Sequence, residues 1–377
     1  YTLYLVVGGL LGPVAGFTVA RFGARINIVL GNVMAAVGLL GVSQSGEIWQ
    51  MYLFFGLLGG LGLAFSEFLP LTTVINHWFI HRRSMALGFL FASGGLAGLV
   101  MPPLISSLIS GIGWRTAWVV LAGLHLVLGV VFAGLLIRNN PEEEGQVPDG
   151  QANSEQRALP GTPAPKLVYC TKEDWRLRDA VGTPALWIIW ILFAAFLFTT
   201  MMLITHQVAY LQDLQYSPSA AAAALGLMLG MSILGRILSG FLGTRFEGRY
   251  LAAAFMASLG LGIISLLNAN KTVCTYLYSI LSGIGVGGMI VLLPNVLSAY
   301  FGRKHFAQIV GWTIPVVTLV SAVSPMLAGF FYDKAGSYLL PFAATAAFLL
   351  ACSFLALLIR PPFMKKGEQQ QSDTRHR

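Results

Sequence analysis

The chain has 377 residues, of which 56% are hydrophobic and only 10% are charged, and its mean hydropathy is +0.74. These values lie outside the usual range of soluble domains and indicate a protein whose solvent is lipid. The formal net charge of +8 does not indicate nucleic-acid binding, because the lysines and arginines fall in the breaks between apolar runs and form no basic stripe.

Apolar runs long enough to cross a bilayer recur along the chain, at ~20 residues for ~30 Å of hydrocarbon. In chain order they lie at residues 1–20, 26–43, 49–76, 84–110, 114–137, 184–212, 218–243, 250–268, 272–300, 306–332 and 336–359. They predict an all-α membrane protein with eleven transmembrane helices. Tyr1 stands directly inside the first run, with no initiator Met and no signal-peptide pattern, so we interpret it as a cut end.

One long polar segment, residues 138–183, follows the fifth run. It is rich in proline and charged residues and cannot bury a core of its own. We therefore expect an N-terminal bundle at residues 1–137, a linker at 138–183, a C-terminal bundle at 184–360 and a tail at 361–377.

Basic residues are distributed unequally between the two sets of loops. The loops on the side of the linker carry Arg21, Arg25, Arg82, Arg83, Arg245, Arg249, Arg303, Lys304, Arg360, Lys365 and Lys366, whereas the opposite loops carry only Arg115, Lys271 and Lys334. Because cytoplasmic loops are enriched in lysine and arginine, we expect a multi-pass protein of the cell membrane with its linker and C-terminus in the cytoplasm.

An internal repeat relates the two groups of helices. Gly16, Arg21, Phe22 and Arg25 recur at a constant offset as Gly240, Arg245, Phe246 and Arg249, and each set stands at the linker-side end of a helix. Two homologous halves related by a pseudo-two-fold axis are implied. If the halves match, the first lacks one helix, expected before Tyr1, so that eleven of twelve helices are present.

The first copy of this repeat resembles the loop between helices two and three of the major facilitator superfamily. It runs Gly12-Pro-Val-Ala-Gly16-Phe-Thr-Val-Ala-Arg21-Phe-Gly-Ala-Arg25. In that family the motif is a gating loop, which implies gating roles for Gly16, Arg21, Arg25, Gly240, Arg245 and Arg249. Ala20 replaces the acidic residue that often precedes the first arginine, so a gating charge contact usual in the family is absent.

Further motifs resemble the monocarboxylate transporter and oxalate/formate antiporter families. They are Trp78-Phe79-Ile80-His81-Arg82-Arg83-Ser84-Met85-Ala86-Leu87-Gly88, then Ser93-Gly94-Gly95, Pro102 and Gly113-Trp114-Arg115, and in the second half Tyr300-Phe301-Gly302-Arg303, Gly311 and Ser324-Pro325. The resemblance covers nearly the whole chain. It implies the major facilitator fold, with helices two to six in the first bundle, and transport of a small organic anion.

Glu67 and Arg236 are the charged residues deep inside predicted spans, where charges are costly and usually functional. The guanidinium of Arg236 is permanently charged and can hold a carboxylate through two nitrogens. Gly235-Arg236 also resembles the eighth helix of those families, whose arginine binds the substrate carboxylate. Glu67 suits a proton-exchanging group, while an alternative is a constitutive ion pair between Glu67 and Arg236.

Two differences from those families narrow the expected substrate. Ser232 stands where monocarboxylate transporters often carry an acidic residue, four positions before Arg236, so proton coupling by that route is absent. Val317 stands where the oxalate transporter uses a lysine, and no lysine or arginine occurs between Phe306 and Tyr332. A dicarboxylate would lack its second cation, which favours a monoanion.

Polar side chains in other spans are further candidates for lining the cavity. They are His206, Tyr276 and Asn295, each of which is also compatible with ordinary helix packing. Cys170, Cys274 and Cys352 are widely spaced and imply neither disulfides nor a metal site. We expect no cofactor and no catalytic residues, since no metalloprotease, P-loop or serine-hydrolase motif occurs.

The sequence thus predicts a secondary active transporter, a monomer in the bilayer, that moves a monocarboxylate such as lactate, pyruvate or formate by alternating access. Coupling to protons and coupling to anion exchange remain open. The alternatives are an exporter of apolar or drug-like compounds, a non-transporting membrane sensor and, most remotely, a membrane-embedded enzyme.

Overall fold

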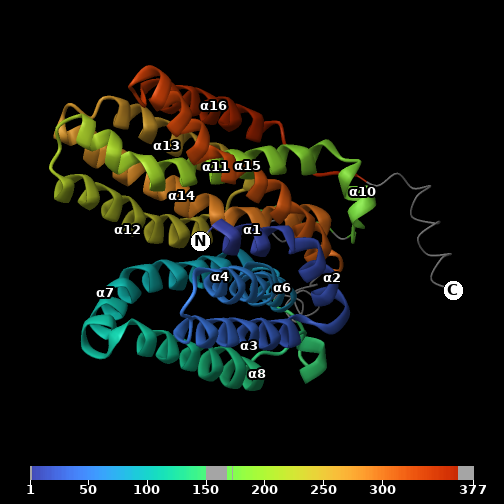
Figure 1. The fold of residues 1–377 in the computed structure, drawn as a ribbon. Helices are drawn as coiled ribbons and strands as arrows, with labels where there is room; N and C mark the ends of the chain where they lie inside the picture. Colours follow the sequence, from blue (N-terminus) through green and yellow to red (C-terminus); the bar gives the residue numbers. More distant parts are fainter. Residues whose placement is uncertain (1, 150–167, 172, 364–377) are drawn as a thin grey trace.

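A computed structural model describes residues 2–149, 168–171 and 173–363, and these form a bundle of helices (Figure 1). Before the linker lie α1 (Thr2–Leu10), α2 (Gly12–Phe22), α3 (Ala24–Ser43), α4 (Ile48–Met51), η1 (Tyr52–Gly59), α5 (Gly60–Ser66), α6 (Phe68–Trp78), α7 (Arg83–Leu124), η2 (His125–Phe132) and α8 (Ala133–Leu136). After α8 come η3 (Pro141–Glu144), α10 (Leu177–Val181), α11 (Pro184–Asp213), α12 (Pro218–Leu242), α13 (Gly248–Leu267), α14 (Thr272–Phe301), α15 (Phe306–Ala335) and α16 (Leu339–Leu357). The predicted tail lies outside the described residues from position 364 onward.

The predicted spans are confirmed within the described part of the chain. Nine helical segments there are long and apolar enough to cross a membrane, and α1 with α2, which meet at 49°, make a tenth. One of these nine segments extends from Arg83 to Leu136. It reverses direction at Gly113, whose φ of 80° favours glycine. Its two limbs match the runs predicted at 84–110 and 114–137, so counting them separately gives the eleven predicted helices.

The two bundles meet chiefly at two helix crossings, α2 with α15 and α7 with α12. At the first crossing, a methyl group on Gly16 would lie 2.6 Å from the carbonyl oxygen of Ala307. At the second, a methyl group on Gly88 would lie 2.9 Å from the carbonyl oxygen of Arg236, and one on Gly240 would lie 3.2 Å from the Cα atom of Gly88. Both crossings therefore need glycine for backbone-to-backbone contact. The repeated glycines occupy equivalent places, as the pseudo-two-fold relation predicts.

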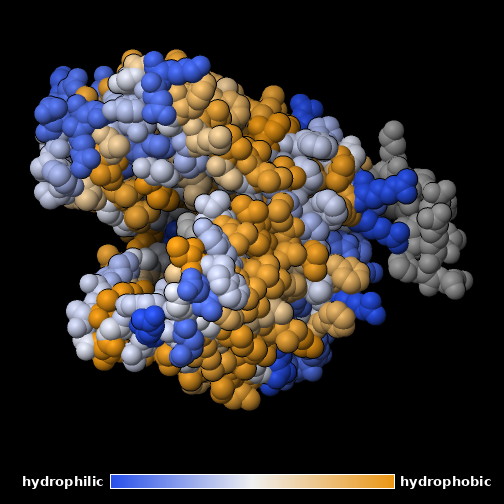
Figure 2. Space-filling view, in the orientation of Figure 1, coloured by the Kyte–Doolittle hydropathy of each residue, from blue (hydrophilic) through white to orange (hydrophobic). Residues whose placement is uncertain are grey.

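Helices α7 and α12 diverge with distance from the linker. Near the linker, the Ser84 hydroxyl donates a hydrogen bond to the Ser239 carbonyl at 3.1 Å. Farther away, a methyl group on Gly98 of α7 or on Gly226 of α12 would meet nothing within 4 Å. Figure 2 shows the resulting hollow between the bundles at its left. We call this hollow the cleft and the closed end, where the linker attaches, the linker end.

Both ends of the linker place an aspartate on backbone N–H groups that precede a long helix. Asp149 accepts hydrogen bonds from the backbone N–H groups of Ile80, His81 and Arg82, just before α7 begins. Asp174 accepts them from Arg303 at 2.9 Å and Lys304 at 3.0 Å, just before α15 begins. A carboxylate is stabilising there, because the start of a helix carries partial positive charge.

We expect Asp174→Ala to lower the stability of the protein by about 1 kcal/mol, the usual effect of removing an acceptor from the start of a helix. Asp174→Asn should lose less, since one of its oxygens still accepts. Thermal unfolding of the purified protein in detergent measures both variants. An alanine variant as stable as the parent would show that water replaces the carboxylate without loss.

Candidate substrate site at the base of the cleft

Arg236 lies where α7 and α12 part, at the base of the cleft. Its neighbour Gly235 presses α12 against α14, because a methyl group there would lie 2.4 Å from the carbonyl oxygen of Ile284. This contact turns the half-buried Arg236 side chain toward α7 and the cleft. Its Nη1 atom donates a hydrogen bond to the carbonyl oxygen of Phe91 at 2.8 Å.

The guanidinium of Arg236 keeps most of its hydrogen-bonding capacity free. The bond to Phe91 is its one hydrogen bond within the described residues, and its Nε atom is buried without a partner. No carboxylate in that part of the chain lies within ion-pair distance of it. A half-buried cation in this condition can accept an anion without first giving up a partner.

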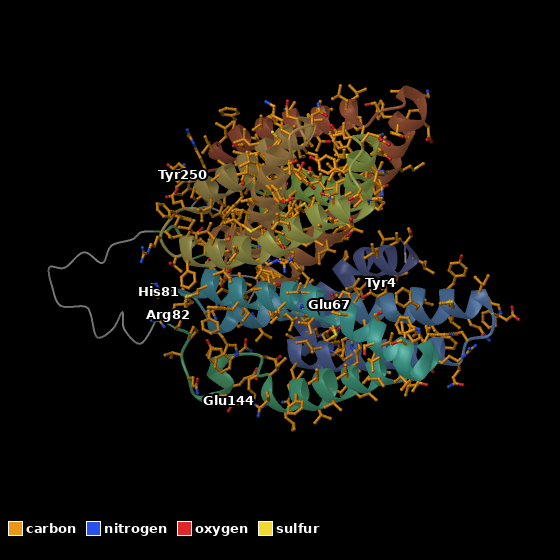
Figure 3. The ribbon with its side chains drawn as sticks, turned by 90° about the vertical axis from the view of Figure 1, so that its left-hand side faces the viewer. Tyr4, Glu67, His81, Arg82, Glu144 and Tyr250 are labelled. Atoms are coloured by element: carbon orange, nitrogen blue, oxygen red, sulfur yellow. The ribbon has the colours of Figure 1, made fainter. Side chains whose placement is uncertain are left out.

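Glu67 lies at a break in the third predicted span, between α5 and α6. Its backbone, with φ −102° and ψ −114°, departs from helical geometry, and its side chain is exposed. Figure 3 shows it in the middle of the molecule, between the linker-end residues His81 and Arg82 and the opposite end. An exposed side chain at that depth is consistent with access from the cleft.

Arg236 and Phe68, the residue after Glu67, both contact Phe91 of α7. The Phe68 ring, next to Glu67, packs against the ring of Phe91 with centroids 5.5 Å apart, and the carbonyl of Phe91 binds Arg236. The structure places no ion pair between Glu67 and Arg236 among the described residues. In this conformation the constitutive pair that we considered from the sequence is absent.

The structure does not bring the other predicted cavity residues to Arg236. His206 is held inside the second bundle, with its Nε2 atom 2.9 Å from the Pro325 carbonyl and its Nδ1 atom 3.2 Å from the Tyr338 hydroxyl. Tyr276 is 58% exposed near the far end of α14. Asn295 is buried at the linker end. A substrate contact for these three residues stays a prediction.

Sequence reasoning missed a buried polar network around Arg83. From the sequence this residue belongs to a solvated loop, yet it is only 4% exposed. Its Nε and Nη1 atoms donate to the side-chain oxygens of Asn295 and Asn76, both at 3.2 Å, and Nη1 also donates to the Ser298 hydroxyl. Asn76 and Arg83 belong to the first bundle, and the other two belong to the second. The network therefore joins the bundles and closes the linker end.

The arginines of the predicted gating loops lie around this closed end. Arg21 stacks over the ring of Phe22 at 5.4 Å, and the backbone N–H of Arg25 donates to the Asn139 side chain at 2.9 Å. Arg249 pairs with Glu247 at 2.8 Å. Arg245 lies in the turn after α12. Their gating role stays a prediction.

A second hollow, inside the second bundle, does not suit an anion. A hollow of about 450 Å³ between α11, α15 and α16 has no charged residue in its lining. No three histidine, cysteine, aspartate or glutamate side chains there are grouped to hold a metal ion.

A profile of the Major Facilitator Superfamily matches residues 1–314 and, in an overlapping second match, residues 209–376. The chain belongs to the Major Facilitator Superfamily. It is therefore a membrane transporter and not an enzyme. Solved structures support the same fold: a proton:xylose symporter bound to 6-bromo-6-deoxy-D-glucose has a TM-score of 0.70 at 14% identity, with 95% of this chain and 84% of that chain covered.

Two more solved members and two curated relatives are informative. The human organic anion transporter MFSD10 has a TM-score of 0.69 at 17% identity, with 94% of this chain and 82% of that chain covered. A FucP structure in the outward conformation has a TM-score of 0.67 at 14% identity, with 95% of this chain and 89% of that chain covered. Monocarboxylate transporter 12 of Xenopus laevis is 23% identical over 92% of this chain and 76% of its own length. Monocarboxylate transporter 13 of Bos taurus is 27% identical over 90% of this chain and 75% of its own length.

We expect Arg83→Ala to destabilise the protein by about 2–3 kcal/mol, because it leaves the buried side-chain oxygen of Asn295 without its donor and removes one of the two donors to the side-chain oxygen of Asn76. Arg82→Ala is the matched control, since Arg82 is the exposed neighbour of Arg83, and it should stay within about 0.5 kcal/mol of the parent. Thermal unfolding of both purified variants measures the difference. Equal effects of the two substitutions would contradict a structural role for the network.

Proposed function

We propose that this protein transports a small monocarboxylate, such as lactate, pyruvate or formate, by alternating access of the cleft to the two sides of the membrane. The observation that carries the proposal is the Arg236 guanidinium, which faces the base of the cleft with a buried Nε atom that has no partner. The substrate carboxylate would bind its free nitrogens in place of water. The names of the curated relatives support the same substrate class.

The charge of the cleft favours a substrate with a single carboxylate. Arg236 is the cation at its base, and α15, which crosses α2 on the other side, has no lysine or arginine from Phe306 to Tyr332. A second carboxylate would therefore lose its hydration without gaining a cation, at a cost of several kcal/mol. A monoanion avoids that cost.

The distribution of basic residues supports a cytoplasmic linker end, because lysine and arginine are retained on that side. The cleft would then open to the outside in the conformation described here. The other conformation requires the Arg83 network to separate and the bundles to close over Arg236 from the outer side.

Glu67 is the group best placed for proton coupling in this scheme. Its neighbour Phe68 packs against Phe91 of α7, whose carbonyl binds Arg236, and Glu67 has no ion pair in the described structure. A proton taken up by Glu67 together with the anion makes the transfer electroneutral. Proton symport is thus the coupling that we propose, and anion exchange is the alternative.

Arg236→Lys should lower the kcat/KM of monocarboxylate uptake by about 10–100-fold, or about 1.4–2.8 kcal/mol, because an ammonium cannot hold a carboxylate through two nitrogens. Arg82→Lys, at the exposed position before α7, is the matched control and should match the parent. Uptake of labelled lactate, pyruvate and formate into vesicles measures both. If Arg236→Ala still transports fully, the anion assignment fails and export of apolar compounds becomes the better function.

Glu67→Gln should retain uptake without a proton gradient but lose the acceleration that an inward gradient gives the parent, since an amide cannot exchange the proton. Glu47→Gln provides a control, because Glu47 lies in an exposed turn before α4. The measurement is uptake into vesicles with equal and unequal internal pH. Full gradient dependence in Glu67→Gln would exclude this carboxyl as the coupling group.

A further inference from the structure

The carbonyl that anchors Arg236 is accessible because Gly95 follows it by one helical turn. In a helix, each carbonyl points toward the residue four positions later, where a side chain ordinarily crowds it. At position 95 there is no side chain, so the Phe91 carbonyl can accept a second hydrogen bond, from Nη1 of Arg236 at 2.8 Å. Gly95 and the Phe91 carbonyl thus form a shallow seat on α7, which we call the guanidinium seat.

The fit of Arg236 in the guanidinium seat is close. A methyl group on Gly95 would lie 2.6 Å from Nη1 and 3.5 Å from Cζ of Arg236, and 2.7 Å from Cγ1 of Ile233. Nη1 is the far end of a flexible side chain, so the guanidinium would move and the helix would stay. An alanine at this position therefore displaces the charged group from the Phe91 carbonyl without unfolding α7.

The seat also exists only while the bundles are close at the linker end. Phe91 and Gly95 belong to the first bundle and Arg236 belongs to the second. On the linker side of the seat, Gly88 and Gly240 bring the helix backbones together, whereas Gly98, on the other side, has open space. A separation of α7 from α12 at the linker end would therefore break the bond between Phe91 and Arg236.

We propose that Gly95 is a positioning residue that holds the Arg236 guanidinium ready for the substrate in the conformation closed at the linker end, and that this hold is lost when the linker end opens. The proposal rests on the function proposed above. A fixed guanidinium binds an anion more tightly, because no side-chain freedom is lost on binding. The affinity for the substrate then falls when the linker end opens.

Three substitutions on one helix test this role. Gly95→Ala should raise the KM for monocarboxylate uptake about tenfold with little change in kcat, whereas Gly94→Ala and Gly98→Ala should stay within about twofold of the parent, since both positions face open space. All three exchange glycine for alanine in α7 and change helix propensity alike. An unchanged KM in Gly95→Ala, or an equal rise in all three variants, would overturn the proposal.

A thermal-unfolding cycle tests the same contact without reference to transport. Gly95→Ala should lower the Tm more in the parent than in an Arg236→Ala background, where the methyl group meets no guanidinium. The contact of the methyl group with Ile233 is common to both backgrounds, so its effect on the Tm cancels. Equal changes in the two backgrounds would overturn the positioning role. If the two changes in Tm differ but uptake does not depend on Arg236, the guanidinium seat is supported and the proposed substrate is wrong.

Discussion

Close approach of helix backbones at the linker end is the constraint on which this structure depends. In a bilayer, helices gain little from burying apolar side chains against each other, and packing at short distance has to supply the attraction. Glycines at both crossings of the two bundles make that distance possible. The same short distance brings backbone carbonyls and hydroxyls of one bundle within hydrogen-bonding range of the other.

Two arginines at this interface have contrasting environments. Arg83 is buried and is surrounded by neutral oxygens from both bundles, so its charge is solvated by the protein itself. Arg236 has one carbonyl and a buried nitrogen that has no partner. In a medium of low dielectric constant, the first arrangement stabilises a conformation and the second favours binding of an anion.

Much of the fold followed from the sequence because the bilayer imposes a simple length rule. Run lengths predicted the spans, and the repeat that contains Gly16 and Gly240 predicted two homologous halves. The two intramembrane charges were also identified, since so few charges occur in spans. The sequence did not reveal that Asn295 meets Arg83 across more than half the chain, because neither residue carries a local signal for the other. Likewise, Gly94, Gly95 and Gly98 look alike in sequence, and only the packing of α12 distinguishes Gly95.

The aspartates at the two ends of the linker attach it to both bundles, one to the loop before α7 and one to the loop before α15. Each attachment point moves with its own bundle. Any rocking motion that parts the bundles at this end must therefore change the distance between the two points, and the chain between them has to span it. The two aspartate contacts consequently enter the energy difference between the two conformations, because they hold one segment of chain to both bundles at once.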